Sequence, residues 1–293
     1  MKKIFLITLF LLANNFLLAQ ELKTFQFYNK KGQSINYNSL LLELQNYDVI
    51  LFGEHHDNST NHWLQLQLTK SLSEAKANNL ILGAEMFERD NQKVLTDYIL
   101  HKIPEDVFKE KVRFWSNYKT DYKPIVDFAK ENKLEFIATN IPRKYASQVS
   151  KNGLESLDTL SIEEKKWIVN LPFPIDYNSP GYPEMMRMME DHMELKAKQF
   201  VDAQAIKDAT MAESILKVLN KDKIFLHFNG DYHSKQYGGI YWYLKNKKPE
   251  LKIAVIQIME SADPNLKLPK LTDEFSILTE FTLVLPKDTI KTY

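Results

Sequence analysis

The stretches Val49-Ile-Leu-Phe-Gly-Glu-His-His56 and Ile224-Phe-Leu-His-Phe-Asn-Gly-Asp-Tyr-His233 share one pattern, an apolar run followed by Gly-x-x-His. Each apolar run is typical of a buried strand, and each glycine marks the point where that strand ends. An open parallel α/β sheet presents side chains in a crevice beyond the carboxyl ends of its strands. The pattern therefore predicts that His56 and His233 meet in one pocket, as a metal, haem or acid–base site requires.

The rest of the chain alternates between strand-like and helix-like segments. This alternation predicts an α/β fold with a mostly parallel sheet flanked by helices. The expected strands are residues 46–52, 80–85, 134–140, 223–228 and 251–258, with an edge strand at 281–285. The expected helices between the first three strands are residues 61–78, 91–100 and 122–132.

A long segment, about residues 143–219, precedes the strand of the second Gly-x-x-His motif. Its pattern is mostly helical, with Gly153 typical of a helix end and Ser161-Ile-Glu-Glu164 matching a capping box. A proline-rich loop at residues 171–183 is followed by one or two further helices. We expect this segment to form a helical cap over the carboxyl edge of the sheet, within a single domain of residues 20–293.

The first residues have the organisation of a secretory signal peptide. Lys2-Lys3 form a positive region, and residues 4–18 are almost wholly apolar. The apolar run is shorter than the ~20 residues that a membrane span needs. We expect cleavage after Ala19, which would export the mature chain to a periplasm or to the outside of the cell.

The composition excludes several classes of site and partner. The 38 basic and 38 acidic residues balance, and no basic stripe stands out, so nucleic acid is not expected as a partner. The chain has no cysteine, which excludes disulfides, thiolate metal sites and a lipid anchor through an acylated cysteine.

Acidic side chains accompany the histidines at the predicted strand ends. Glu54 follows the first strand directly, and Glu85 ends the second. A buried carboxylate is costly unless it is paired, hydrogen-bonded or bound to a metal, so we expect both near the site. His55 should diverge from its neighbour His56 and lie at the rim.

Two further sets of residues have both a structural and a binding interpretation. His62 and Gln65 lie one turn apart on the first helix, either toward the crevice or on a solvated face. The cap holds five of the nine methionines, with His192 among them and Tyr182 just before. These methionines either pack between helices or line a slot for a flat apolar ligand. They are Met185, Met186, Met188, Met189 and Met193.

On these residues, the chain resembles the ChaN-type haem-binding family of the Tiki superfamily. The matching motifs occur in order along nearly all of the mature chain. They are Ile50-Leu-Phe-Gly-Glu-His-His-Asp57, His62-x-x-Gln65, Glu85-Met-Phe87, Trp115 with Tyr118, Ala138-Thr-Asn140 with Pro142-Arg143, Gln204-x-x-x-Asp208 and Gly230-Asp-Tyr-His233. The resemblance implies haem binding linked to iron acquisition, a tyrosine-type axial ligand and haem shared across a homodimer. An outer-membrane receptor would suit that role as a partner.

Haem binding assigns roles to several residues. A tyrosinate favours ferric haem iron, and Tyr232 is the first choice because it adjoins His233 at a strand end. His233 and His56 would then lie beside the bound haem, with Arg143 pairing a propionate. Contacts from the cap on the other side of the haem would come from Tyr182, His192 and Met186.

The alternative is a metal-dependent hydrolase or protease of the Tiki type. His56, His233 and Glu85 would hold a divalent ion such as Zn, Mn or Co, with a water in the open position. Glu54 would act as general base, or Glu85 would take that role. The methionine-rich cap favours haem, because a hydrolase needs an open cleft and less apolar surface.

Overall fold

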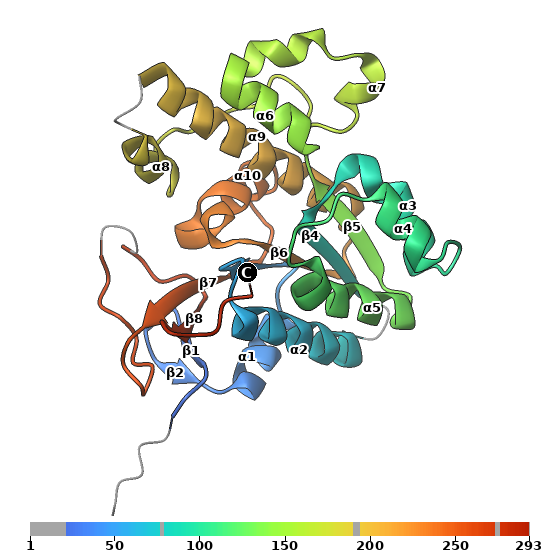
Figure 1. Ribbon diagram of the computed structural model, residues 1–293. Coiled ribbons are helices and arrows are strands. Elements are labelled where there is room, and N and C mark those ends of the chain that lie inside the picture. Colours follow the sequence, from blue (N-terminus) through green and yellow to red (C-terminus); the bar gives the residue numbers. More distant parts are fainter. Residues whose placement is uncertain (1–21, 77–78, 190–193, 273–275, 293) are drawn as a thin grey trace, which may run out of the picture.

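The computed structural model describes residues 22–76, 79–189, 194–272 and 276–292. The expected signal peptide, residues 1–19, lies outside the described residues, as do His192 and Met193. Within the described part of the chain, one sheet of eight strands carries helices on both faces, as predicted (Figure 1). No helix in these ranges is both long and apolar enough to cross a membrane.

The strands are β1 (Gln26–Asn29), β2 (Ser34–Ile35), β3 (Val49–Glu54), β4 (Leu80–Glu88), β5 (Glu135–Asn140), β6 (Ile224–Gly230), β7 (Ile253–Ser261) and β8 (Phe281–Pro286). The α-helices of the described residues are α1 (Tyr37–Leu44), α2 (Ser59–Lys76), α3 (Gln92–Ile99), α4 (Glu105–Lys111), α5 (Lys123–Asn132), α6 (Arg143–Asn152), α7 (Ile162–Lys165), α8 (Tyr182–Met188), α9 (Glu194–Val218) and α10 (Gly239–Lys247).

The strand order is β2-β1-β8-β7-β3-β6-β4-β5. Every neighbouring pair from β8 to β5 is parallel, and β1 pairs antiparallel with both β8 and β2. The central strand β3 is buried along its whole length, which explains its continuous apolar sequence. The sequence prediction did not include β1 and β2.

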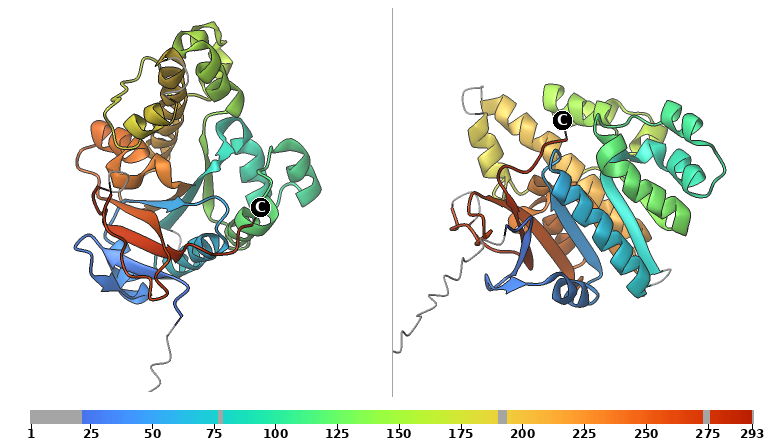
Figure 2. Two further views of the ribbon diagram at one scale, coloured as in Figure 1. Left: turned by 60° about the vertical axis from the view of Figure 1, so that its left-hand side comes forward. Right: turned by 60° about the horizontal axis from the view of Figure 1, so that its bottom comes forward.

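Alternate residues of each central strand enter two separate hydrophobic cores. Ile50 and Phe52 of β3 pack with helices α1, α2, α3 and α5, whereas Val49 and Leu51 pack with α6, α9 and α10. The two views of Figure 2 show these helix layers on opposite faces of the sheet. Both faces are therefore closed, and polar groups gather at the strand ends.

The insertion between β5 and β6 contains α6, α7, α8 and α9. Helix α6 ends at Gly153 with φ +83°, and Ser161 with Glu164 forms the predicted capping box. Helix α9 does more than cover the strand ends, because Ile206 and Ile215 belong to the hydrophobic core on the sheet face that packs with α6 and α10. The insertion thus builds one face of the core as well as a wall of the site.

The strand register brings the two Gly-x-x-His segments together. Strand β3 pairs in parallel with β6, with Gly53 opposite Asn229 and Glu54 opposite Gly230. Both strands end at the same edge, and their following residues enter the same crevice. The predicted meeting of the two motifs is confirmed.

Candidate functional site

A cavity of about 930 Å³ lies at the carboxyl ends of β3, β4 and β6, beside α8 and α9. It has the size and position of a small-molecule site in an α/β fold. Its lining residues are Glu54, His55, His56, Glu85, Glu88, Arg113, Phe114, Trp115, Ser116, Asn117, Asn140, Ile141, Arg143, Met185, Gln204, Lys207, Gly230, Asp231, Tyr232 and His233.

Glu54 is a buried anion held by three donors. Its carboxylate lies 2.8 Å from His56 Nδ1 and accepts hydrogen bonds from Gln65 Nε2 at 2.8 Å and Tyr122 Oη at 2.7 Å. Burial alone would raise the pKa of Glu54, but His62 and His56 outweigh it and lower that pKa. Because a carboxylate only accepts, His56 Nδ1 carries a proton toward Glu54.

His56 is half-buried, and its ring makes an edge-to-face contact with Trp115, with the ring centroids 4.8 Å apart. Burial would lower the pKa of His56, but its hydrogen bond to Glu54 and the charge of Glu54 raise it overall. His55 turns elsewhere, with its Nδ1 atom 3.2 Å from Glu260 Oε1. The prediction that the neighbouring histidines diverge is confirmed.

His233 is buried between two carboxylates. Its Nε2 lies 3.1 Å from Glu85 Oε1, and its Nδ1 contacts Asp208 Oδ1. Burial alone would lower the pKa of His233, yet the charges of Glu85 and Asp208 raise it to about 9. Burial would raise the pKa of Glu85, but the nearby His233 lowers it overall. His233 is therefore an imidazolium at neutral pH, bonded through both nitrogens.

Gly230 is required by the close approach of the two motifs. Its backbone N–H donates to Glu85 Oε2 at 2.8 Å. A Cβ added at Gly230 would lie 2.7 Å from His56 Nε2, closer than real Cβ contacts. The glycine in this Gly-x-x-His segment thus makes room for the histidine of the other segment.

The predicted polar pair on α2 lies behind the cavity rather than on a solvated face. His62 and Gln65 are 4% and 0% exposed. His62 Nε2 lies 3.0 Å from the carbonyl oxygen of His56, and Asn117 Nδ2 donates to the same oxygen at 2.8 Å. These residues hold the loop after β3, so their role in the structure is positional.

Tyr232 lines the cavity and is half-buried. Its hydroxyl donates to Glu184 Oε1 at 3.0 Å, and Lys235 Nζ lies 3.4 Å from the centroid of its ring. The ammonium of Lys235 also lies 3.5 Å from Glu184 Oε2. A buried cation therefore contacts the ring of the tyrosine that the sequence singled out.

The cap residues named from the sequence pack in one small hydrophobic cluster, but only some of them reach the cavity. Met185 lines the cavity and Met186 does not, although both pack with Tyr182 in that cluster. Tyr182 is 2% exposed and donates to Asp208 Oδ2 at 2.7 Å, so it supports Asp208 and does not line the cavity. Burial and the charge of Asp208 raise the pKa of Tyr182 well above its usual value. Neither Tyr182 nor Met186 lines the cavity, so the structure does not place them where contacts from the cap to haem were expected.

Cationic side chains occupy the same cavity. Arg143 begins α6 and is exposed, and Arg113 and Lys207 also line the space. Arg113 lies 3.4 Å from Glu88, whereas Arg143 makes no ion pair with a described residue. These three groups offer charge to an anionic ligand.

A divalent metal site does not form from the predicted residues. Among the described residues, no group of three or more His, Asp or Glu side chains is arranged to hold a metal ion. The physical reason is that His233 already contacts Glu85 and Asp208 through both nitrogens, while a metal ligand must be a neutral imidazole with a free nitrogen. The structure does not support the set of His56, His233 and Glu85 as metal ligands.

Several site residues lie on a helix that the strand-end pattern does not reach, and Gln204 and Asp208 entered the sequence analysis only through the family resemblance. Asp208, Gln204 and Lys207 lie on α9, distant in sequence from both Gly-x-x-His segments. Gln204 Nε2 lies 3.0 Å from His233 Nδ1. Asp208 is also a charged residue among buried neighbours on this helix, which is a second signal that it has a partner.

The fold and these motifs agree with one known family. The family model described as haem-binding uptake, Tiki superfamily, ChaN matches residues 40–244, well over half of the chain. The chain belongs to this family. No curated protein matches the sequence.

Solved structures of related fold include ChaN of Campylobacter jejuni, described as binding haem cofacially. It is 18% identical, with a TM-score of 0.66, and the match covers 90% of this chain and 97% of that one. The erythromycin esterase EreC is 11% identical, with a TM-score of 0.46 and coverage of 88% and 83%. The likeness to the Campylobacter protein establishes that this chain has the ChaN fold.

Proposed function

We propose that this chain is an exported protein that binds haem in the cavity between the strand ends and helices α8 and α9, as a step in haem-iron acquisition. The observation that carries the proposal is the meeting of three kinds of side chain in one space. Tyr232 offers a phenol oxygen, Trp115 and Met185 offer apolar contact, and Arg143 offers charge. These are the groups that iron, a porphyrin face and a propionate require.

The lining residues fit haem in chemistry and in volume. The cavity of about 930 Å³ lies within the range for sites that enclose small organic ligands. Phe114, Trp115, Ile141 and Met185 form its apolar surface. Haem bound there would supply an iron that accepts an oxygen ligand, and Tyr232 is the side chain placed to provide it. The hydrogen bond from Tyr232 to Glu184 gives its proton an acceptor.

The buried carboxylates do not oppose an anionic ligand as strongly as their number suggests. Glu54 contacts His56, and Glu85 contacts the cationic His233. A propionate entering the cavity therefore meets partly neutralised pairs and the cations at the mouth. An ion pair between a propionate and one of these cations would be strongest where water is excluded.

A pair of substitutions on one helix tests whether haem occupies this cavity. Met185→Trp would narrow the cavity, whereas Met188→Trp places the same side chain at a position that is 61% exposed. Haem titration followed by visible absorption should show saturable binding that weakens at least ~10-fold in the Met185 variant, since steric overlap in a packed site costs ~1–3 kcal/mol. The Met188 variant should bind like the parent chain. Equal binding by both variants, or no saturable binding by the parent, would overturn the proposal.

A further inference from the structure

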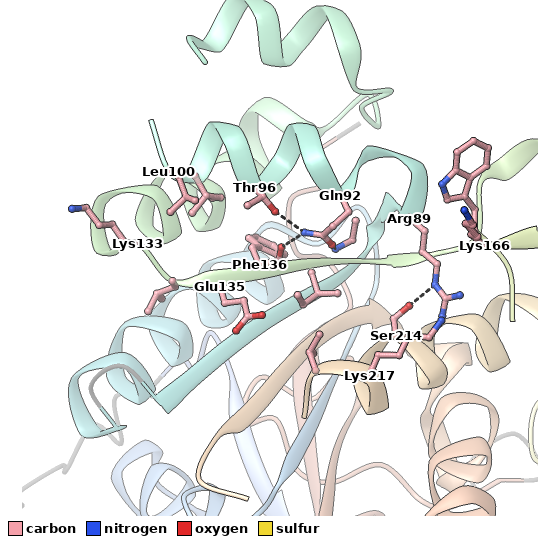
Figure 3. A pocket seen from close by; sticks show the side chains of 16 residues that line it. Arg89, Gln92, Thr96, Leu100, Lys133, Glu135, Phe136, Lys166, Ser214 and Lys217 are labelled. Carbon is pink, nitrogen blue, oxygen red and sulfur yellow. Dashed lines mark hydrogen bonds between the residues drawn. The ribbon is translucent and has the colours of Figure 1, made fainter. Parts of the chain in front are cut away.

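The cavity at the carboxyl ends of β3, β4 and β6 is called the haem cavity below. A second cavity of about 580 Å³ lies beside β5, the strand at one edge of the sheet. It is bounded by α3, β5 and the last turns of α9 (Figure 3). Its surface includes Leu100, Leu134, Phe136, Ile137, Trp167 and Val218. None of these residues lines the haem cavity, so this groove is a separate feature of the fold.

The charges around the groove are mostly of one sign. Arg89, Lys133, Lys166 and Lys217 line it, with Glu135 as the one acidic residue among the lining side chains. This differs from the haem cavity, whose lining includes Glu54, Glu85, Glu88 and Asp231. An apolar surface bordered by cations complements a ligand with an apolar body and an anionic head.

The cations differ in whether they are already paired. Arg89 and Lys217 both contact Glu213, and Lys166 contacts Glu163. Lys133 makes no ion pair with any residue in the described ranges. Figure 3 shows Lys133 and Leu100 together at one end of the groove, with Arg89 and Lys166 at the other. Lys133 is therefore the cation most available to an incoming anion.

The backbone groups of β5 that border the groove already have hydrogen-bond partners. Gln92 Oε1 accepts from Ala138 N at 2.7 Å. Gln92 Nε2 donates to Phe136 O at 3.0 Å (Figure 3). A parallel neighbouring strand would bond this same pair of groups, on either side of Ile137. Gln92 thus takes the place of an added strand, and an extended peptide could not pair here without displacing it.

We propose that the groove between α3, β5 and α9 binds a free medium-chain fatty carboxylate, with its aliphatic chain along β5 and its head toward Lys133. An aliphatic chain needs no backbone hydrogen bonds, so it is compatible with the amide of Gln92. The lining run of residues 134–138 spans ~13 Å at about 3.3 Å per residue, which suits an extended acyl chain rather than a compact ligand. Leu100, which is 44% exposed, would be covered by that chain.

Calorimetric titration with three probes of equal tail length tests the proposal. Decanoate, decanol and decyltrimethylammonium, each kept below its micelle-forming concentration, share a tail and differ in head charge. Decanoate should bind saturably at one site, and the cationic probe should bind at least ~10-fold more weakly. Equal affinity for the anionic and cationic probes, or non-saturable uptake of decanoate, would overturn the proposal.

Variants then locate the site. Lys133→Gln should weaken decanoate roughly two- to fivefold, as for an exposed ion pair, and leave decanol unchanged. Leu100→Asp should weaken both probes, whereas Lys31→Gln, in an exposed turn distant from the groove, should change neither. Tyr232→Phe should also leave decanoate binding intact, which separates this site from the haem cavity. Decanoate binding that is lost in Tyr232→Phe, or kept in both groove variants, would contradict the assignment.

Discussion

His233 Nε2 lies 3.1 Å from Glu85 Oε1, joining two side chains that are 148 positions apart in the sequence. The other ring nitrogen contacts Asp208, from a third element of the fold. The site is therefore built around a buried cation between two carboxylates, at the point where β4, β6 and α9 meet. Its stability and its chemistry depend on the charge of that histidine.

The first prediction concerns the pH dependence of stability. The pKa of His233 is about 9 in the folded chain and 6.5 as an ordinary histidine. Because the pKa of His233 is higher in the folded chain, its protonation stabilises the fold. This contribution to the free energy of unfolding is complete below pH 6.5 and is lost as the pH rises through about 9. The contribution is on the order of 3 kcal/mol. Urea unfolding measured across this range should show the parent chain losing stability.

Asp208→Asn supplies the comparison for that prediction. Removing one of the two carboxylates should lower the pKa of His233 and flatten the loss of stability between pH 6.5 and 9. Asp202→Asn is a matched control, because that carboxylate lies on the same helix but accepts from Tyr177. A pH profile of Asp208→Asn that parallels the parent profile would show that the His233 pair does not carry the effect.

The second prediction concerns the close approach at Gly230. Gly230→Ala should destabilise the chain by about 1–3 kcal/mol and weaken haem binding, because the new Cβ would overlap the His56 ring. The double variant Gly230→Ala with His56→Ala should recover most of the lost stability, since the clashing ring is gone. If the losses of stability from the two substitutions simply added, the clash would not be between the new Cβ and the His56 ring.

The strand order and the site differ in how far the sequence could predict them. The apolar runs ending at Gly53 and Gly230 indicated two buried parallel strands, because a strand covered on both faces must be apolar throughout. The short strand β2 has only two residues and lies at an edge, so it has no such pattern. Pairing with β1 and the turn at Gly32 define it.

The side chains that contact His233 could be predicted from the sequence only in part. Glu85 was predicted because a carboxylate at the end of an apolar run must find a partner. Asp208 sits on a long helix, and its distance from His233 depends on how α9 lies across the sheet. Tyr182 was expected to face the ligand, but its hydroxyl satisfies the second oxygen of Asp208. Tertiary packing decided both positions.

The third prediction concerns the cation at the mouth of the cavity. Arg143→Gln should weaken haem binding roughly two- to tenfold, as expected for an exposed charge-assisted contact with a propionate. Haem dimethyl ester has no carboxylate to pair, so its affinity should be equal for the parent and the variant. A variant that binds both forms as the parent does would remove Arg143 from the site.

The fourth prediction concerns export. Expression of residues 1–293 in a bacterium should give a mature protein that begins at Gln20, since Ala19 follows the apolar run of residues 4–18. Intact-mass measurement of protein from the periplasm or the medium tests the cleavage point. A chain recovered only in the cytoplasm with its first 19 residues intact would contradict the expected export.

The most direct test of the central claim is the visible absorption spectrum of the haem-loaded mature chain, compared with its Tyr232→Phe and Tyr182→Phe variants. We predict a high-spin, tyrosinate-type spectrum in the parent that is lost in Tyr232→Phe and kept in Tyr182→Phe, because Tyr232 lines the cavity and Tyr182 does not. Tyr241→Phe, outside the cavity, is the control for the substitution itself. A tyrosinate spectrum that survives in Tyr232→Phe would contradict the assignment of the haem ligand and, with it, the proposed site.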